Sequence, residues 1–390
     1  MKALERAKSA VRLIRDPFTG YPELYRRFGP VSEIGPYVNL LGPEANKFVF
    51  ANAELFSWRG AFEPLIPVDG ETALIVSDGE DHQRRRRLVT PAFSRARIAG
   101  YEKTMAAHAD RVIDTWRPGS VVDVYPEFRT AIRRATIEVL FGPVLAADEP
   151  ALGRDLQIAL DLLDQSPLLQ QAQRFLPSYR RAVAARARVE AKVRAEMARD
   201  RSSDDVLGAL LGSGLSDVEI VDQVISLIAA GYETTSAAMA WAVRASLMHP
   251  GESSLDDLVS ETLRLYPPAV ISLRKTVREF TYEGHRVRAG RFVVYSPFVT
   301  HRLEEVWPDP LRFDPSRWET RKPGPHEYLP FGGGPHRCVG SHFALTELRA
   351  MLARLRLRTS LELLDDAFKP TSLAAMRPRD GVRVRVLAVS

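Results

Sequence analysis

The stretch Phe331-Gly332-Gly333-Gly334-Pro335-His336-Arg337-Cys338-Val339-Gly340 is the most informative part of the chain. Three glycines and a proline before a cysteine cannot extend a helix or a strand. The residues that follow, Ser341 to Leu348, have a helical pattern. The pattern therefore predicts that Cys338 lies in a tight loop that leads into a helix. Loop amides and the positive end of that helix would both stabilise an anionic sulfur.

Cys338 is the single cysteine in a chain of 390 residues. An intrachain disulfide is excluded, and nothing points to an oxidising compartment. A lone cysteine is most often a small buried hydrophobic residue, so its neighbours decide whether it takes part in chemistry. One cysteine also cannot hold an iron–sulfur cluster.

The composition is that of a globular protein with a large core, since 45% of the residues are hydrophobic and 26% are charged. The formal net charge of +5 allows an acidic partner but does not demand nucleic acid. The first residues, Met1 to Arg6, hold no apolar run, so we expect no membrane anchor and a cytoplasmic location.

Helical periodicity dominates from Tyr101 to Val243. Its most apolar part, Val221 to Val243, also contains charged residues, which favours a central buried helix over a membrane span. Strand-like patterns are short and occur in residues 31–34, 38–41, 280–282, 291–295 and 382–386. Because strands and helices do not alternate regularly, we do not expect a Rossmann or TIM architecture. The sequence predicts a mainly α chain with small β-sheets.

The central helix contains Ala230-Gly231-Tyr232-Glu233-Thr234-Thr235. Glycine and two β-branched hydroxyl residues are poor choices for a helix interior. A threonine hydroxyl at this position can bond a carbonyl of the preceding turn and bend the helix. The result would be a small groove that carries an acid and an alcohol, although Glu233 alone could equally be a surface residue.

Both stretches resemble the cytochrome P450 family. Residues 331–340 match its pattern Phe-Gly-x-Gly-x-His/Arg-x-Cys-x-Gly, and residues 230–235 match Ala-Gly-x-Asp/Glu-Thr-Thr. Glu261 and Arg264, on a helix that starts with the capping-box-like residues 254–257, resemble the family's Glu-x-x-Arg pair. The segment 313–318 resembles the part of the family that supplies a third member, Arg317. The resemblance implies the cytochrome P450 fold, a single large triangular domain over residues 1–390 without a fused reductase.

The resemblance also assigns roles to particular residues. Cys338 would ligate the iron of haem b as a thiolate. Thr234 would hydrogen-bond the bound dioxygen, and Glu233 would relay protons from solvent. Four residues would bind the anionic haem carboxylates, namely His82, Arg86, Arg274 and His336.

The run Arg84 to Arg87 lies on the helix that carries His82. Adjacent helical residues point about 100° apart, so four arginines cannot all face a porphyrin. If Arg86 turns inward, Arg84, Arg85 and Arg87 are left for solvent or for an acidic ferredoxin. The run belongs to no recognised nucleic-acid-binding module, so we expect no nucleic-acid partner.

The substrate side is expected to be apolar. The loop from Ser57 to Val76 covers the distal pocket in the family, and we expect the pocket to be lined by Trp58, Phe62, Pro64, Leu65, Ile66, Leu74, Ile75, Ala229, Ala230, Val270, Ile271, Ala375 and Met376. For each of them, ordinary core packing is the alternative. One departure from the family is the short segment Gly251 to Ser260, where another helix is usual.

The resemblance thus implies a monomeric monooxygenase that inserts one oxygen atom from dioxygen into a small, largely apolar organic substrate. Electrons would come from a separate ferredoxin and ferredoxin reductase. Two alternatives stay open: a related enzyme that uses peroxide or couples radicals, and a haem-binding protein without catalysis.

Overall fold

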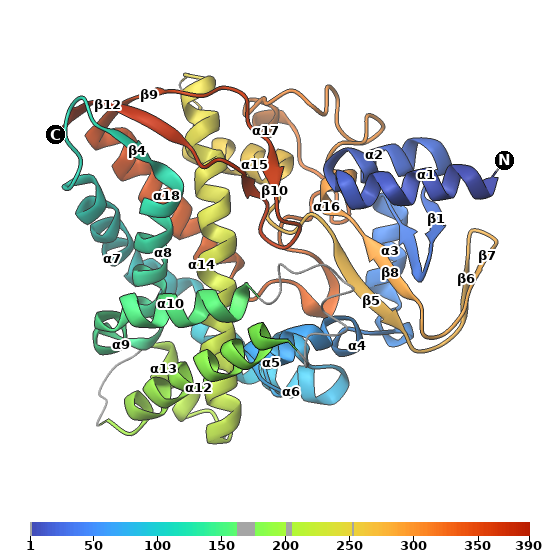
Figure 1. Cartoon of the computed structure of the whole chain (residues 1–390), viewed down its shortest axis with the longest axis horizontal. Coiled ribbons are helices and arrows are strands. Elements are labelled where there is room, and N and C mark those ends of the chain that lie inside the picture. The colour runs from blue at the N-terminus through green and yellow to red at the C-terminus, as the bar shows by residue number, and fades with distance from the viewer. Residues whose placement is uncertain (1, 162–175, 200–204, 252) are drawn as a thin grey trace. The chain divides into compact units, whose positions relative to one another are not determined.

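The computed structural model describes residues 2–161, 176–199, 205–251 and 253–390, and Figure 1 shows the course of the chain. The chain divides into two compact units. The sheet unit comprises Met1–Ala61, His249–Cys338 and Phe368–Arg379. The helical unit comprises Phe62–Met248, Val339–Ala367 and Asp380–Ser390.

The sheet unit is built on a five-stranded sheet in the order β1-β2-β8-β5-β3. Only the pair of β2 and β8 is parallel; the other neighbours are antiparallel. The strands of this unit are β1 (Val31–Ile34), β2 (Tyr37–Leu40), β3 (Phe56–Ser57), β5 (Ser272–Thr276), β6 (Phe280–Tyr282), β7 (His285–Val287), β8 (Phe292–Tyr295), β10 (Pro370–Thr371) and β11 (Arg377–Pro378). The α-helices that begin in it are α1 (Lys2–Arg15), α2 (Pro17–Phe28), α3 (Pro43–Ala51), α4 (Arg59–Phe62), α15 (Leu255–Leu265), α16 (Pro297–Thr300) and α17 (Arg317–Thr320).

Local sequence explains the turns of this unit. Glu283 and Gly284, between β6 and β7, have φ of 46° and 76°, so the tight hairpin needs the glycine. The helix α15 starts where predicted, because the Ser254 side chain accepts a hydrogen bond from the Asp257 amide at 3.1 Å. In the described residues, no helix lies between the end of α14 at Met248 and the start of α15 at Leu255, in line with the short segment Gly251 to Ser260.

The helical unit is organised around α14 (Asp217–Met248), a helix of 32 residues with α8 and α18 packed against it (Figure 1). The other α-helices are α5 (Ile66–Asp69), α6 (Gly79–Val89), α7 (Arg95–Ile113), α8 (Val124–Phe141), α9 (Pro143–Ala147), α10 (Glu149–Leu160), α12 (Pro177–Met197), α13 (Val206–Leu211) and α18 (Ser341–Arg358). A three-stranded antiparallel sheet is formed by β4 (Val121–Asp123), β12 (Arg383–Val389) and β9 (Thr359–Leu363).

The structure confirms the predicted helical region, the buried central helix and the short strands. The parts of the helical prediction at residues 162–175 and 200–204 lie outside the described residues. Close packing of α14 on α8 depends on Gly231, since a Cβ there would lie 3.1 Å from the Thr136 methyl group. The most apolar part of the chain, Val221 to Val243, is therefore buried against other helices, as predicted.

Candidate functional site

The cysteine loop has the irregular backbone that its glycines predict. Gly332 and Gly334 both have φ of 65°, a conformation that other residues rarely adopt. A Cβ on Gly333 would lie 2.4 Å from the Phe50 ring, so the loop backbone packs directly on that ring. The Cys338 amide donates to the Phe331 carbonyl at 2.9 Å and closes the loop. Cys338 is exposed, and α18 begins three residues later at Ser341.

Two further predicted residues, Arg274 and His336, lie in the sheet unit with Cys338. Arg274 is on β5 and is buried, and its guanidinium lies 3.7 Å from the centroid of the Trp58 ring. His336, in the loop, stacks on the same indole at 4.3 Å between centroids, with 10° between the planes. Arg274 also donates to the Leu273 carbonyl at 2.7 Å. The structure thus brings Arg274 and His336 together through Trp58, which the sequence had placed among the residues lining the substrate pocket.

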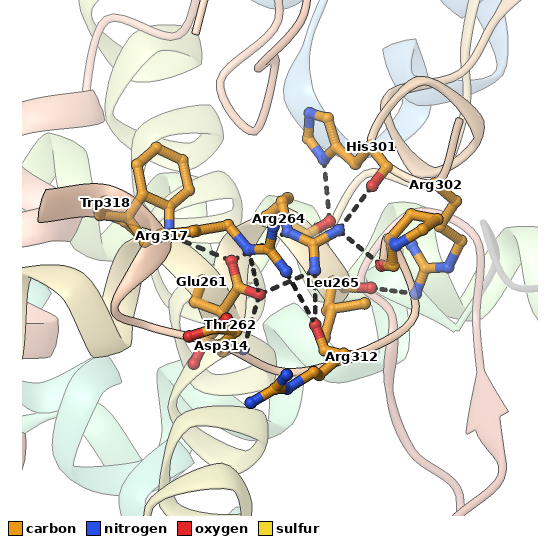
Figure 2. A network of polar contacts seen from close by, with 12 residues as sticks. Glu261, Thr262, Arg264, Leu265, His301, Arg302, Arg312, Asp314, Arg317 and Trp318 are labelled. Carbon is orange, nitrogen blue, oxygen red and sulfur yellow. Dashed lines mark hydrogen bonds and ion pairs between the residues drawn. The ribbon is translucent and has the colours of Figure 1, made fainter. Parts of the chain in front are cut away.

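The predicted ion network of Glu261, Arg264 and Arg317 is confirmed (Figure 2). Glu261 and Arg264 are completely buried and pair through two hydrogen bonds of 2.8 and 2.9 Å. Arg317 donates to Glu261 at 3.0 Å, and the Asp314 amide and Trp318 indole donate at 2.9 and 3.1 Å. Five donors therefore satisfy one buried carboxylate, as its burial requires.

His301 connects this network to the segment that precedes the cysteine loop. Its Nδ1 donates to the Arg264 carbonyl at 3.0 Å, and its Nε2 accepts from the Leu329 amide at 2.7 Å. This pattern fits only the neutral ring. Burial, together with the charge of Arg264, lowers the pKa of His301 well below its usual value. The buried network therefore fixes the backbone two residues before Phe331.

Thr234 and Glu233 lie on α14 in the helical unit. The Thr234 hydroxyl donates to the Ala230 carbonyl at 2.8 Å, and the Thr235 hydroxyl to the Gly231 carbonyl at 2.7 Å, as expected for hydroxyl residues inside a helix. Ala230 is exposed although most of the helix is buried. Because residues four apart share a helix face, Ala230 and Thr234 define an accessible face of α14.

Glu233 has partners that the sequence did not reveal. Arg129 of α8 donates to its carboxylate through Nε and Nη2 at 2.8 and 2.7 Å, and the Tyr125 hydroxyl donates at 3.1 Å. The side chains of Glu233 and Arg129 are 17% and 19% exposed. The acid is therefore held in a half-buried ion pair. Tyr125 and Arg129 are four residues apart on one helix, but nothing in the sequence tells which helix that face meets.

His82 and Arg86 lie on α6, also in the helical unit. His82 is buried, and burial together with the charge of Arg86 lowers its pKa to about 4, so the ring is neutral at physiological pH. The charge of Arg86 therefore acts on the His82 ring, one turn earlier on the same helix.

The prediction for the neighbouring residues Arg84 and Arg85 was wrong. The sequence left Arg84 and Arg85 for solvent or a partner, but both bind Glu219 of α14, Arg85 through its Nε at 3.0 Å. Arg85 is buried and also donates to the Ser77 hydroxyl at 2.8 Å. Burial would raise the pKa of Glu219, but hydrogen bonds from the Ser216 amide and the two arginines lower it to about 2. In this run Arg87 is exposed.

Some of the expected pocket residues belong to a core. Val270 and Met376 are fully buried and form a hydrophobic cluster with Phe298, against which Ile271 packs. Ordinary core packing, the alternative considered for each of these residues, accounts for Val270 and Met376.

The residues of the sheet unit fit the group that the motifs imply. The Cys338 sulfur is exposed on a loop whose conformation depends on Gly332 and Gly334. Cysteine thiolates bind iron in some haem proteins. A guanidinium and an imidazole, stacked on one indole, are donors suited to carboxylates. The donor set of the sheet unit therefore fits a haem group with carboxylate side chains.

The comparisons with known proteins agree with this chemistry. The family model for cytochrome P450 matches residues 17–251 and 254–383, so the chain belongs to the cytochrome P450 family. It is 44% identical to the putative cytochrome P450 139 of Mycobacterium tuberculosis, over 93% of this chain and 96% of that protein. It is 32% identical to the cyclooctat-9-en-7-ol 5-monooxygenase of Streptomyces melanosporofaciens, over 82% and 79% of the two chains.

Solved structures show the same fold. Retinoic acid-bound cyanobacterial CYP120A1 superimposes with a TM-score of 0.83 at 24% identity, over 97% of this chain and 96% of that one. CYP175A1 from Thermus thermophilus has a TM-score of 0.81 at 25% identity, over 96% of both chains. The protein has the cytochrome P450 fold and is a P450 monooxygenase with a haem-iron cofactor. Among the described residues, no helix is both long and apolar enough to cross a membrane.

Proposed function

We propose that this monooxygenase binds haem b through the Cys338 thiolate and inserts one oxygen atom from dioxygen into a small, largely apolar organic substrate. The observation that carries the proposal is the exposed, single cysteine in a glycine loop closed by the bond from its own amide to Phe331. Haem, once bound, would supply the activation of dioxygen, with electrons from a separate donor. The loop amides and the start of α18 favour the anionic form of the sulfur that such a ligand needs.

The haem carboxylates are assigned to Arg274 and His336 of the sheet unit and to His82 and Arg86 of the helical unit. Their donor chemistry supports this assignment, since two guanidinium groups and two imidazoles suit anionic oxygens.

Proton delivery is assigned to Thr234 and Glu233. The Thr234 hydroxyl donates a hydrogen bond to the Ala230 carbonyl, so its lone pairs remain available as acceptors on the accessible face of α14. Glu233 would relay protons from solvent toward Thr234. Arg129 and Tyr125 hold its carboxylate in position through hydrogen bonds. Glu233→Gln should slow turnover, because a neutral amide cannot relay a proton. Unchanged turnover in this variant would remove Glu233 from the relay.

The substrate is proposed to be largely apolar. Ala230, exposed on α14, gives that face of the helix an apolar lining beside the Thr234 hydroxyl. One relative supports the same class, since the name cyclooctat-9-en-7-ol 5-monooxygenase describes an alkenol.

Electrons are proposed to come from a separate ferredoxin and its reductase, in the cytoplasm, where reduced nicotinamide cofactors are produced. Arg87 and the net charge of +5 favour an acidic ferredoxin. Arg87→Glu should slow the first electron transfer at low salt, with Arg154→Glu on α10 as a control that makes the same charge change. Equal rates in both variants and wild type would remove Arg87 from the docking surface.

The proposed reaction is tested by turnover with a ferredoxin, its reductase and NADPH on a panel of small apolar compounds. With isotopically labelled dioxygen, one labelled oxygen atom should appear in the product. Product formed only with added peroxide, or a coupled product without labelled oxygen, would favour the peroxide-using or radical-coupling enzyme instead.

A further inference from the structure

Trp58 lies in the sheet unit, and the proposed function gives it no role in binding haem. The strand β3 pairs with β5 so that Phe56 lies opposite Thr276 and Ser57 opposite Lys275. Continuing this antiparallel register by one residue brings Trp58 level with Arg274. The pairing of β3 with β5 therefore brings the backbone of Trp58 next to that of Arg274.

The indole contacts both donors assigned to the haem carboxylates in this unit. The Arg274 guanidinium lies 3.7 Å from the ring centroid, close enough for a strong cation–π contact. The His336 ring stacks in parallel at 4.3 Å. One side chain thus links the sheet arginine to the histidine that lies two residues before Cys338.

We propose that Trp58 is a positioning residue for the haem, holding Arg274 and His336 in the orientation in which they bind its carboxylates. Arginine has a long side chain with many rotamers, and a stacked guanidinium loses less conformational freedom when it binds. The stacking of His336 also ties the cysteine loop to the sheet. The inference rests on the proposed assignment of Arg274 and His336 to the haem carboxylates.

The test measures the rate at which the purified holoenzyme loses haem to excess apomyoglobin. Trp58→Leu keeps an apolar side chain but removes the aromatic face, and it should release haem about tenfold faster. Trp58→Phe keeps a face for stacking and should stay within about threefold of wild type. Lys275→Ala is the matched control. Lys275 is on the same strand as Arg274, but its ammonium group lies 5.9 Å from the Phe292 ring of β8, so its removal should leave haem release unchanged.

The variants Arg274→Ala and His336→Ala separate the inference from the assignment beneath it. If neither variant speeds haem release, the assignment to the carboxylates is wrong. If both do while Trp58→Leu behaves like wild type, the positioning role of Trp58 is wrong.

Equal acceleration in Trp58→Leu and Trp58→Phe would also overturn the positioning role, because stacking would then not be the cause. Thermal unfolding of the same variants provides the remaining check. If the Leu and Phe variants have the same drop in melting temperature and release haem at the same rate as each other, Trp58 has a role in stability alone.

Discussion

Replacing Glu261 by glutamine should destabilise the protein severely. The carboxylate and its partner Arg264 are both completely buried. Glutamine has nearly the same shape, but it is neutral and only one of its two terminal atoms accepts hydrogen bonds. The five donors that now converge on Glu261 would compete for one oxygen, and the buried guanidinium would lose its counter-charge.

Removing one partner of a buried ion pair costs about 3–5 kcal/mol. A domain is typically stable by about 5–15 kcal/mol, so the loss would take a large share of the total. Because His301 joins the Arg264 carbonyl to the Leu329 amide, the damage should extend to the cysteine loop and lower the haem content.

The assay is urea unfolding followed by circular dichroism, with haem content measured on the same samples. The matched control is Glu362→Gln, which removes the charge of an exposed pair with Arg385 whose side chains are 54% and 47% exposed. An exposed pair is worth about 0–1 kcal/mol, so the control should unfold close to wild type. If Glu261→Gln unfolds at the same urea concentration as the control, the buried network does not support the fold as argued.

Three further predictions concern the two units separately. Thr234→Ala should uncouple the enzyme, so that NADPH consumption persists while product falls and peroxide rises; an unchanged ratio of product to NADPH with the true substrate would contradict its role. Gly333→Ala should lower haem content because its methyl group collides with the Phe50 ring at 2.4 Å, and Phe50→Leu in the same chain should restore it in part; full haem content in the single variant would show that the loop tolerates the methyl group. Asp69 is buried, and burial raises its pKa to about 7. Between pH 4 and 7 the folded protein therefore binds a proton at Asp69 that the unfolded chain does not hold. The free energy of unfolding should fall as the pH rises through that range. Asp69→Asn should therefore melt at a higher temperature than wild type at pH 8, with the difference shrinking toward pH 4, and equal melting curves at pH 8 would refute the argument.

Much of the site could be predicted from short stretches of sequence. The loop conformation follows from Gly332 and Gly334, and the place of Cys338 just before α18 follows from the helical pattern after Gly340. The burial of α14 follows from its apolar composition. These features depend on residues that are neighbours along the chain.

The partners of the site residues could not be predicted in the same way. Arg129 is 104 residues from Glu233, and Glu219 is 134 residues from Arg85. Pairing at such separations depends on which helix faces meet, and charge pattern alone does not determine that. The same holds for Trp58, whose place beside Arg274 depends on the register of β3 against β5.

The ligation of haem iron by the Cys338 thiolate is the central claim, and the absorption spectrum of the reduced carbon monoxide complex tests it most directly. Freshly prepared, folded protein should show the Soret band at the long wavelength that defines haem-thiolate proteins, and Cys338→Ala should lose that band. A Soret band at the shorter wavelength typical of haem with a neutral nitrogen ligand, in wild-type protein that is fully folded, would contradict the account.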